Sequence, residues 1–457
     1  MFKKQGDQFV GPEETDLKLK LATDTGFWTL AHPYGTEWTF NETGKMLRMV
    51  KACCGQGAFD SVVLDYDVNN RLHRVTNPIG QWLEFSFNSD GFVSQTSDST
   101  GRTVSYTYNS QGFLTSCTNP IGQTTEYTYT EEGFLTQVQK PGNKTTSITY
   151  QDRRATQVSN PDGTSAHFAW DLTASKLSFI DLGGTLHEYQ FTPAWKLESY
   201  AVPSLGINKE FISSGAALIG FQNSLGGNES FHYNADGLFD SKTDVLGNTS
   251  HFEYHPQFHR LTKKTDVLGR ESNYVWCPRG NLWSEIDPAG GVTSYTYDAH
   301  NNRTSRTDPL GRVTRWVYDS TGNYLTQTID PESGVSSFSY DIRGNLISSS
   351  DPLGRTTQFQ YDLLDRLTKT VYPDGRFVEI EYNEAGNVAV RRDNLGRETR
   401  YSYDLSDRLT TLTRPDDTTF NYAYNEGGQK ISETDSLGRV TRFEYSPIGL
   451  LTKTIYP

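Results

Sequence analysis

The chain has 457 residues, a formal net charge of −13, 35% hydrophobic residues and 13% aromatic residues. Such an acidic chain argues against nucleic-acid binding, which depends on Lys and Arg to neutralise phosphates. No segment approaches the ~20 consecutive apolar residues of a membrane helix, and the basic N-terminus lacks the apolar core of a secretory signal. We therefore predict no nucleic-acid partner and no membrane span.

Residues 1–37 are predicted to form an N-terminal lead-in segment, before an array of repeats that occupies residues 38–457. An insertion near 47–60 interrupts the array and contains Cys53 and Cys54. Adjacent cysteines do not have the spacing of a zinc or redox motif. We interpret them as ordinary small side chains, and four cysteines in all predict no disulfide framework.

An aromatic anchor then returns every 20 to 22 residues, usually followed by Asp or Asn. The anchors are Tyr66, Phe87, Tyr108, Tyr129, Tyr150, Trp170, Phe191, Ile212, Tyr233, Tyr254, Trp276, Tyr297, Tyr318, Tyr340, Tyr361, Tyr382, Tyr403, Tyr424 and Tyr445. Ile212 alone is not aromatic, and residues 160–235 form a degenerate part that keeps the spacing. A fixed period of this length predicts a repeat architecture.

One unit, residues 355–375, reads RTTQFQYDLLDRLTKTVYPDG. Alternation over Thr357–Tyr361 predicts a strand with Phe359 and Tyr361 on one face. The letters DLLD then predict a turn, and RLTKTVY a second strand. Each unit is therefore a β-hairpin, and we expect the rings of successive hairpins to meet as ladders.

The hairpins are joined by turns such as DPLGR at 308–312 and 351–355. Pro at the second position and Gly at the fourth suit a type I turn, which the leading Asp can cap. In the turn that follows each anchor, the pairs Gly344-Asn345 and Gly386-Asn387 are of residue types that tolerate positive φ, so we predict positive φ there.

The fold class predicted from these features is all-β, with about 20 tandem ~21-residue hairpins in a continuous spiralling antiparallel sheet, a partial β-shell. At ~4.8 Å between strands, about 40 strands give a strip on the order of 190 Å long. Such a strip makes about one turn, so we expect it not to seal alone and its edges to associate.

The segments YDIRGNL, YDLLDRL, YNEAGNV and YDLSDRL, alternating with DPLGR-type turns, resemble Rhs or YD repeats. The resemblance runs from about Phe40 to Pro457. It implies a strip wound into a hollow shell, as in Rhs polymorphic toxins, the toxin-complex B/C cocoon, wall-associated proteins and teneurins. In the bacterial members the shell encloses a C-terminal toxin and carries a DPxGxxGG-type cleavage signature. That signature is not found here, and the array is interpreted as ending in mid-repeat.

The resemblance implies a structural scaffold segment, secreted or at the cell surface as part of a longer protein. Its partners would be downstream repeats and a C-terminal toxin domain. The alternative is a surface adhesion or carbohydrate-binding protein, whose partners would be glycans.

Three groups of residues could suggest a site, and each has a simpler interpretation. The turn carboxylates could bind calcium, but each stands beside an Arg four residues on, and turn capping is favoured. His251, His255 and His259 lie four apart, but Pro256 blocks the helix that would align them. Glu131 and Glu132 fall at a turn. The turn carboxylates are those of Asp266, Asp308, Asp351, Asp393 and Asp435.

Rings recurring at every unit are interpreted as structural rather than as sugar-binding platforms. The sequence lacks the GxSxG, HExxH and P-loop patterns. We therefore predict no catalytic, cofactor-binding or metal-binding residue, and no enzyme activity.

Overall fold

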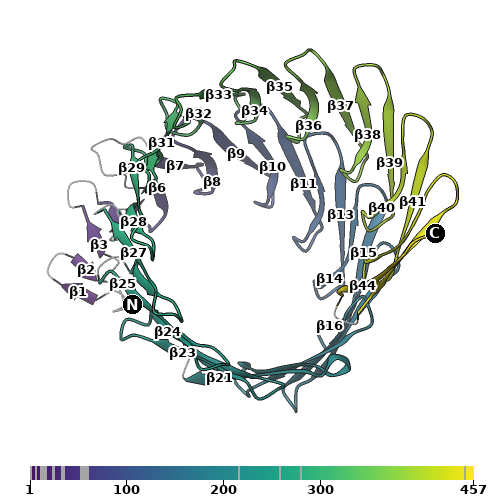
Figure 1. Ribbon diagram of the computed structural model, residues 1–457, viewed down its shortest axis with the longest axis horizontal. Coiled ribbons are helices and arrows are strands. Elements are labelled where there is room, and N and C mark those ends of the chain that lie inside the picture. The colour runs from purple at the N-terminus through teal and green to yellow at the C-terminus, as the bar shows by residue number, and fades with distance from the viewer. Residues whose placement is uncertain are drawn as a thin grey trace. The chain divides into compact units, whose positions relative to one another are not determined.

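The computed structural model describes residues 3–5, 8–10, 18–22, 26–31, 36–51, 61–214, 217–256, 259–277, 280–446 and 449–457. In these residues the chain forms 44 strands and one short 3-10 helix, η1 (Pro203–Leu205). Figure 1 shows antiparallel hairpins that follow one another in chain order. The predicted all-β array of tandem hairpins is confirmed. Cys53 and Cys54 lie outside the described residues.

The chain divides into two units. Unit 1 comprises Met1–Thr103 and Phe231–Thr357, and unit 2 comprises Val104–Ser230 and Gln358–Pro457. The division falls within three strands, β11 (Thr103–Tyr108), β23 (Asn228–Tyr233) and β35 (Thr356–Tyr361).

The other strands of unit 1 are β1 (Lys3–Gln5), β2 (Gln8–Val10), β3 (Lys18–Leu21), β4 (Trp28–Ala31), β5 (Thr36–Phe40), β6 (Met46–Lys51), β7 (Ser61–Tyr66), β8 (Leu72–Thr76), β9 (Trp82–Phe87), β10 (Val93–Asp98), β24 (Phe239–Thr243), β25 (Thr249–Tyr254), β26 (Leu261–Thr265), β27 (Glu271–Trp276), β28 (Leu282–Ile286), β29 (Val292–Tyr297), β30 (Arg303–Thr307), β31 (Val313–Tyr318), β32 (Leu325–Ile329), β33 (Val335–Tyr340) and β34 (Leu346–Ser350).

The other strands of unit 2 are β12 (Leu114–Thr118), β13 (Thr124–Tyr129), β14 (Leu135–Lys140), β15 (Lys144–Gln151), β16 (Arg154–Ser159), β17 (Ser165–Asp171), β18 (Lys176–Ile180), β19 (Leu186–Phe191), β20 (Leu197–Val202), β21 (Ile207–Ser214), β22 (Ala217–Asn223), β36 (Leu367–Val371), β37 (Phe377–Tyr382), β38 (Val388–Asp393), β39 (Glu398–Tyr403), β40 (Leu409–Thr413), β41 (Thr419–Tyr424), β42 (Lys430–Thr434), β43 (Val440–Tyr445) and β44 (Leu451–Ile455).

The pairing between the two strands of a hairpin usually contains a β-bulge just before the anchor, a feature that the sequence analysis missed. Between β39 and β40, Ser402 pairs with Thr411 but Tyr403 pairs with Leu409, so Thr410 has no partner. Its hydroxyl donates to the carbonyl oxygen of Ser402 at 3.1 Å. The recurring letters Leu-Thr at the start of the second strand were the available signal. The same hydroxyl bond is made by Thr136, Thr262, Thr326, Thr368 and Thr452.

The turns with a leading Asp form as the sequence predicts. The Asp308 carboxylate accepts hydrogen bonds from the backbone N–H groups of Leu310 and Arg312, each at 2.9 Å, and from Arg312 Nε at 2.7 Å. Gly311 has φ +78°. The same Asp–Arg pairing occurs from Asp266, Asp351, Asp393 and Asp435. Turn capping by these five residues is therefore confirmed.

The turn that follows each aromatic anchor differs from the prediction in one detail. Gly344 and Gly386 have φ +90° and +88°, but the left-handed residue is the Gly alone and not the following Asn. Asp365 and Asp407 take the same place, with φ +59° and +65°. One αL residue suffices to close a turn whose leading Asp or Asn already satisfies the next amides.

The anchors are fixed mainly by their polar ends, because a single-layer array offers little interior. The Tyr382 hydroxyl donates to the carbonyl oxygen of Leu367 at 2.8 Å, and the Arg366 guanidinium lies 4.4 Å from the ring centre. Ring-to-ring contact occurs at some anchors, such as Phe113 with Tyr129 at 5.2 Å. The predicted continuous ring ladder is thus wrong in part, since an Arg after the turn replaces the second ring elsewhere.

The described residues contain hardly any fully buried apolar side chains. Val202 is 2% exposed and Tyr295 is 7% exposed, and no other apolar side chain in this part of the chain counts as buried. This agrees with the low hydrophobic content, because stability comes from contacts between neighbouring hairpins rather than from a thick core.

We expect Gly311→Ala to lower the free energy of unfolding by about 1–2 kcal/mol, because a left-handed conformation costs an L-residue that much. A Cβ at position 311 would meet no atom within 4 Å, so the loss comes from the backbone alone. Gly311→Asn is the control, since Asn tolerates αL better. Urea unfolding checks both, and an Asn variant no more stable than the Ala variant would contradict this cause.

Candidate functional site: the seam between distant turns

In each unit, turns from stretches far apart in the sequence touch one another. In unit 1, Gln81 Nε2 donates to the carbonyl oxygen of Ile342 at 2.5 Å. In unit 2, Gln123 Nε2 donates to that of Glu384 at 2.9 Å, and both pairs are separated by 261 residues. We call the contacts in unit 2 between Val104–Ser230, the first stretch, and Gln358–Pro457, the second stretch, the seam.

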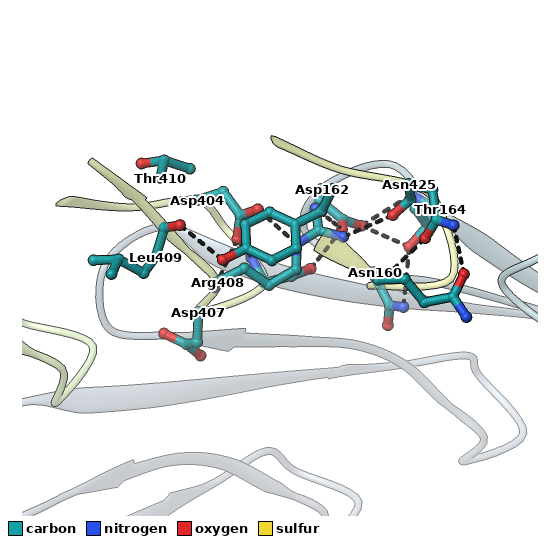
Figure 2. Close-up of polar contacts among 12 residues, drawn as sticks. Asn160, Asp162, Thr164, Asp404, Asp407, Arg408, Leu409, Thr410 and Asn425 are labelled. Carbon is teal, nitrogen blue, oxygen red and sulfur yellow. Dashed lines mark hydrogen bonds and ion pairs between the residues drawn. The ribbon is translucent and has the colours of Figure 1, made fainter. Parts of the chain in front are cut away.

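Asp162 lies in the seam, in the turn between β16 and β17 (Figure 2). Its Oδ1 accepts hydrogen bonds from the backbone N–H and the hydroxyl of Thr164, at 3.0 and 2.6 Å. Its Oδ2 faces the second stretch, where it accepts a bond of 2.6 Å from the Ser406 hydroxyl and lies 3.2 Å from an Arg408 nitrogen. One carboxylate thus closes its own turn and joins the two stretches.

Arg408 is held in place by its own stretch before it reaches Asp162. Its Nε donates to Asp404 Oδ2 at 2.7 Å, and another nitrogen donates to the carbonyl oxygen of Asn425 at 3.3 Å. Figure 2 shows the guanidinium between Asp404 and Asp162. An Arg fixed in this way loses less side-chain entropy on pairing with Asp162 than a free one.

A second ionic contact lies nearby. The Lys144 ammonium pairs with the Asp407 carboxylate, which also accepts a hydrogen bond from the Asn387 side chain. The side chain of Lys144 is 10% exposed, whereas that of Asp407 is 48% exposed.

Both seam carboxylates stay ionised at neutral pH. Burial pushes the pKa of Asp162 upward, but hydrogen bonds from Ser406 and Thr164 and the Arg408 charge outweigh it and hold the pKa below its usual value. Burial likewise raises the pKa of Asp407, and hydrogen bonds from Lys144 and Asn387 more than reverse this. The seam is therefore ionic under ordinary conditions.

These directions set the pH dependence of the seam. A carboxyl whose folded pKa is depressed stabilises the fold fully above its unfolded pKa, near 3.9, and loses that contribution as pH falls through the folded pKa. We expect a constant urea midpoint for unit 2 from pH 7 to 5 and a decline below pH 4. In the Asp162→Asn variant the urea midpoint should fall less steeply below pH 4. A fall as steep as in the unchanged protein would mean that Asp162 does not contribute to the pH dependence.

The residues considered as sites in the sequence lie within the repeat. His251 belongs to β25, where it pairs with Ser241 and Thr265, and His255 and His259 close the following turn through a backbone bond of 2.9 Å. Glu131 and Glu132 lie in a turn beside an open cavity of about 770 Å³ that Phe134 and Tyr150 also line. Within the described ranges, no three His, Cys, Asp or Glu residues are grouped to hold a metal ion.

The sequence analysis missed every seam residue. In the turn 160–164 the acid stands third, as Asp162, rather than first as in the DPLGR turns. The same placement occurs at Asp416, which bonds only within its own turn, so it does not mark a seam residue, and the partner Ser406 is 244 residues away. In the described part of the chain the one helix is η1, so no helix there is long enough to cross a bilayer.

Two family models match the chain. The RHS repeat model matches residues 278–313, 297–335, 340–376 and 382–419, and the teneurin YD-shell model matches residues 60–212. Similar solved structures include the crystal structure of TcdB2-TccC3, with TM-score 0.60, and that of TcdB2-TccC3-Cdc42, with TM-score 0.59.

Sequence identity to both is 12%, which supports a shared fold alone. The matches cover 100% and 98% of this chain but only 31% and 30% of those chains, so this chain spans about a third of their length. No curated protein matches.

Proposed function

Because this chain belongs to the RHS and YD repeat family, we propose that it is a segment of a shell wall and that the completed shell encloses a C-terminal toxin domain. The observation that carries this proposal is the seam. A strip of hairpins can act as a wall only if stretches distant in the sequence meet along their turns, and Asp162, Ser406 and Arg408 make such a contact. The shared fold with TcdB2-TccC3 supports the same role.

The proposed role is structural rather than enzymatic, and the protein carrying the wall is secreted or displayed at the cell surface. The side chains that recur along the array already have structural partners. The turn carboxylates close turns, as in Asp308, and the anchor hydroxyls bond to backbone carbonyls, as in Tyr382. The wall would act by separating its contents from solvent and from proteases.

Protease protection in the full-length gene product tests enclosure. A specific protease site is placed in the domain that follows the array, and a control site is placed in the exposed turn 308–312. We expect cleavage of the control site in the native protein and cleavage of the enclosed site only after unfolding. Equal native cleavage rates, or a gene that continues into a membrane or wall anchor, would overturn the proposal.

The match to the teneurin YD-shell model over residues 60–212 favours one alternative, a surface adhesion or carbohydrate-binding protein. Its partner would be a glycan held against exposed rings. A glycan array discriminates the two: submillimolar binding that is lost when exposed Trp170 or Trp195 is changed to Ala supports this alternative. No binding to any glycan would count against carbohydrate binding by this protein.

A further inference from the structure

The turns of the two stretches in unit 2 interdigitate along the seam in one register. Turn 140–144 joins two hairpins of the first stretch and lies between two consecutive anchor-following turns of the second stretch. A Cβ on Gly142, its third residue, would lie 3.4 Å from the Ala385 Cβ, and Lys144, its fifth residue, pairs with Asp407 in the next turn along. Third residues also meet as Asp162 with Ser406 and Gly183 with Gly427, and another fifth residue, Gln123, bonds to Glu384. The third and fifth residues of an inserted turn thus make the contacts.

The inserted turn 140–144 lies in a socket that the second stretch forms. A cavity of about 310 Å³ remains there, and Gly142 and Lys144 of the inserted turn line one part of it. The rest of the lining comes from the first, second, third and fifth residues of turn 383–387, from the next anchor, Tyr403, and from the start of the turn after that anchor. A socket therefore consists of an anchor-following turn, the next anchor and the turn after it.

The first stretch contains a second set of these elements, made of its own anchor-following turns. They surround an open cavity of about 770 Å³, which we call the open socket. Its lining again comprises the first, second, third and fifth residues of one turn, the next anchor and the turn after it. These residues are Thr130, Glu131, Glu132, Phe134, Tyr150, Asp152 and Arg153. All seven belong to the first stretch, so the described residues that line the open socket include no inserted turn.

The open socket carries more negative than positive charge. Its lining holds the carboxylates of Glu131, Glu132 and Asp152 and one guanidinium group, that of Arg153. Glu131 and Glu132 are both exposed. In the occupied socket of the seam, the inserted turn brings the cation Lys144 to a carboxylate. The charge of the open socket therefore favours an inserted turn that has a cation as its fifth residue.

Turns of that kind lie along the second stretch. We call the turns with the sequence Asp-x-Leu-Gly-Arg the leucine turns, and in unit 2 they are 393–397 and 435–439. Leu437 is 76% exposed, whereas Ile121, the third residue of a turn in the seam, is 38% exposed. The side chain of Arg439 is 63% exposed. The third and fifth residues of a leucine turn thus lack the cover that the seam gives to the same positions.

An Arg in such a turn can still bind a carboxylate of another stretch. Arg439 Nε donates to Asp435 Oδ2 at 2.7 Å, and a guanidinium has five N–H donors, so others are left. In the seam, Arg408 makes the same bond to Asp404 and also lies 3.2 Å from Asp162 of the first stretch. A leucine turn therefore supplies the cation that suits the open socket, in a geometry that the seam already uses.

The seam joins the hairpin-joining turns of the first stretch to the anchor-following turns of the second. In the described part of unit 2, the open socket and the leucine turns therefore belong to the two edges that the seam leaves uncovered. We propose that a second copy of this chain inserts a leucine turn, such as 435–439, into the open socket, with Arg439 against Glu131 and Glu132. Such a head-to-tail contact can repeat from copy to copy. The association goes beyond the proposed wall role, because it does not depend on what the array encloses.

Sedimentation velocity of the full chain over a range of concentrations tests this association. We expect Glu131→Lys combined with Glu132→Lys to raise the dissociation constant about tenfold, because like charges then face Arg439. Glu198→Lys combined with Glu210→Lys is the matched control, since it makes the same charge change at exposed positions within β20 and β21. This control should leave the dissociation constant unchanged.

A second variant blocks the leucine turns instead of the open socket. Glu332 stands third in turn 330–334, which has the same backbone bonds, so an acid is compatible with this position. The variant therefore carries Leu→Glu at the third residue of every leucine turn, at Leu268, Leu310, Leu353, Leu395 and Leu437. Each variant alone should stay monomeric where the unchanged protein associates. An equal mixture of the two should form 1:1 dimers and nothing larger, because each variant supplies the surface that the other lacks.

Three results would overturn the proposal. The first is an unchanged protein that stays monomeric at every concentration. The second is association that persists in both variants, which would indicate pairing between exposed strand edges instead. The third is a mixture that stays monomeric although circular dichroism shows both variants to have the strand content of the unchanged protein.

Discussion

Tyr424→Ala is expected to lower the free energy of unfolding of the array by about 3 kcal/mol, within the range for removing a packed aromatic ring. The Tyr424 hydroxyl donates to the carbonyl oxygen of Leu409 at 2.9 Å, and the Arg408 guanidinium lies 5.3 Å from the ring centre. The substitution removes both contacts at once and loosens the junction of β41 with the preceding hairpin. Urea unfolding followed by intrinsic fluorescence measures the loss.

Tyr424→Phe is the matched control, since it keeps the ring over Arg408 and removes only the hydroxyl. We expect it to cost about 1 kcal/mol, the usual net value of one hydrogen bond. Hydrogen exchange at the start of β40 should rise in the Ala variant more than in the Phe variant. If Phe costs as much as Ala, the ring does not contribute and the anchor role assigned to it is wrong.

Asp162→Ala is expected to lower the free energy of unfolding by about 2–3 kcal/mol, because it removes charge-assisted bonds and leaves the Ser406 hydroxyl and one face of Arg408 without an acceptor. Asp162→Asn keeps the shape and can still accept from Ser406, so about half of that loss should remain. The loss comes from the seam and should appear as faster hydrogen exchange in both turn 160–164 and turn 404–408.

Asp416 provides a matched control for this experiment. It stands third in the turn 414–418 and accepts bonds of 3.1 and 2.6 Å from Thr418, almost the same local geometry as Asp162 with Thr164. In the described residues no hydrogen bond or ion pair joins it to the first stretch. Asp416→Ala should therefore cost clearly less than Asp162→Ala, and equal losses would mean that Asp162 acts only within its own turn.

The local structure of this protein could be predicted because every signal for it lies within about five residues. The alternation in Thr357–Tyr361 predicts a strand, and the turn letters around Asp308 and Gly311 predict a tight turn. The repeat period then predicts the same strand and turn in the other units of the chain. The bulge at Thr410 was missed, although its letters recur, because a Thr in a strand has a simpler explanation in β-propensity.

The ring ladders were predicted too broadly for a related reason. The sequence places rings two residues apart, but which side chain covers each ring depends on the residue after the turn of the preceding hairpin. That residue is Phe113 before Tyr129 and Arg366 before Tyr382. Both a second ring and a guanidinium can cover an aromatic face, so spacing alone did not distinguish them.

The amino-acid sequence by itself determined the hairpin, its turns and the family to which the array belongs, because these rest on short-range hydrogen bonds and on a repeated pattern. Only the tertiary structure determined the seam. Asp162 and Ser406 are 244 residues apart, and Lys144 and Asp407 are 263 apart. No local motif specifies which residues meet over such separations, because a turn sequence determines only the conformation of its own few residues.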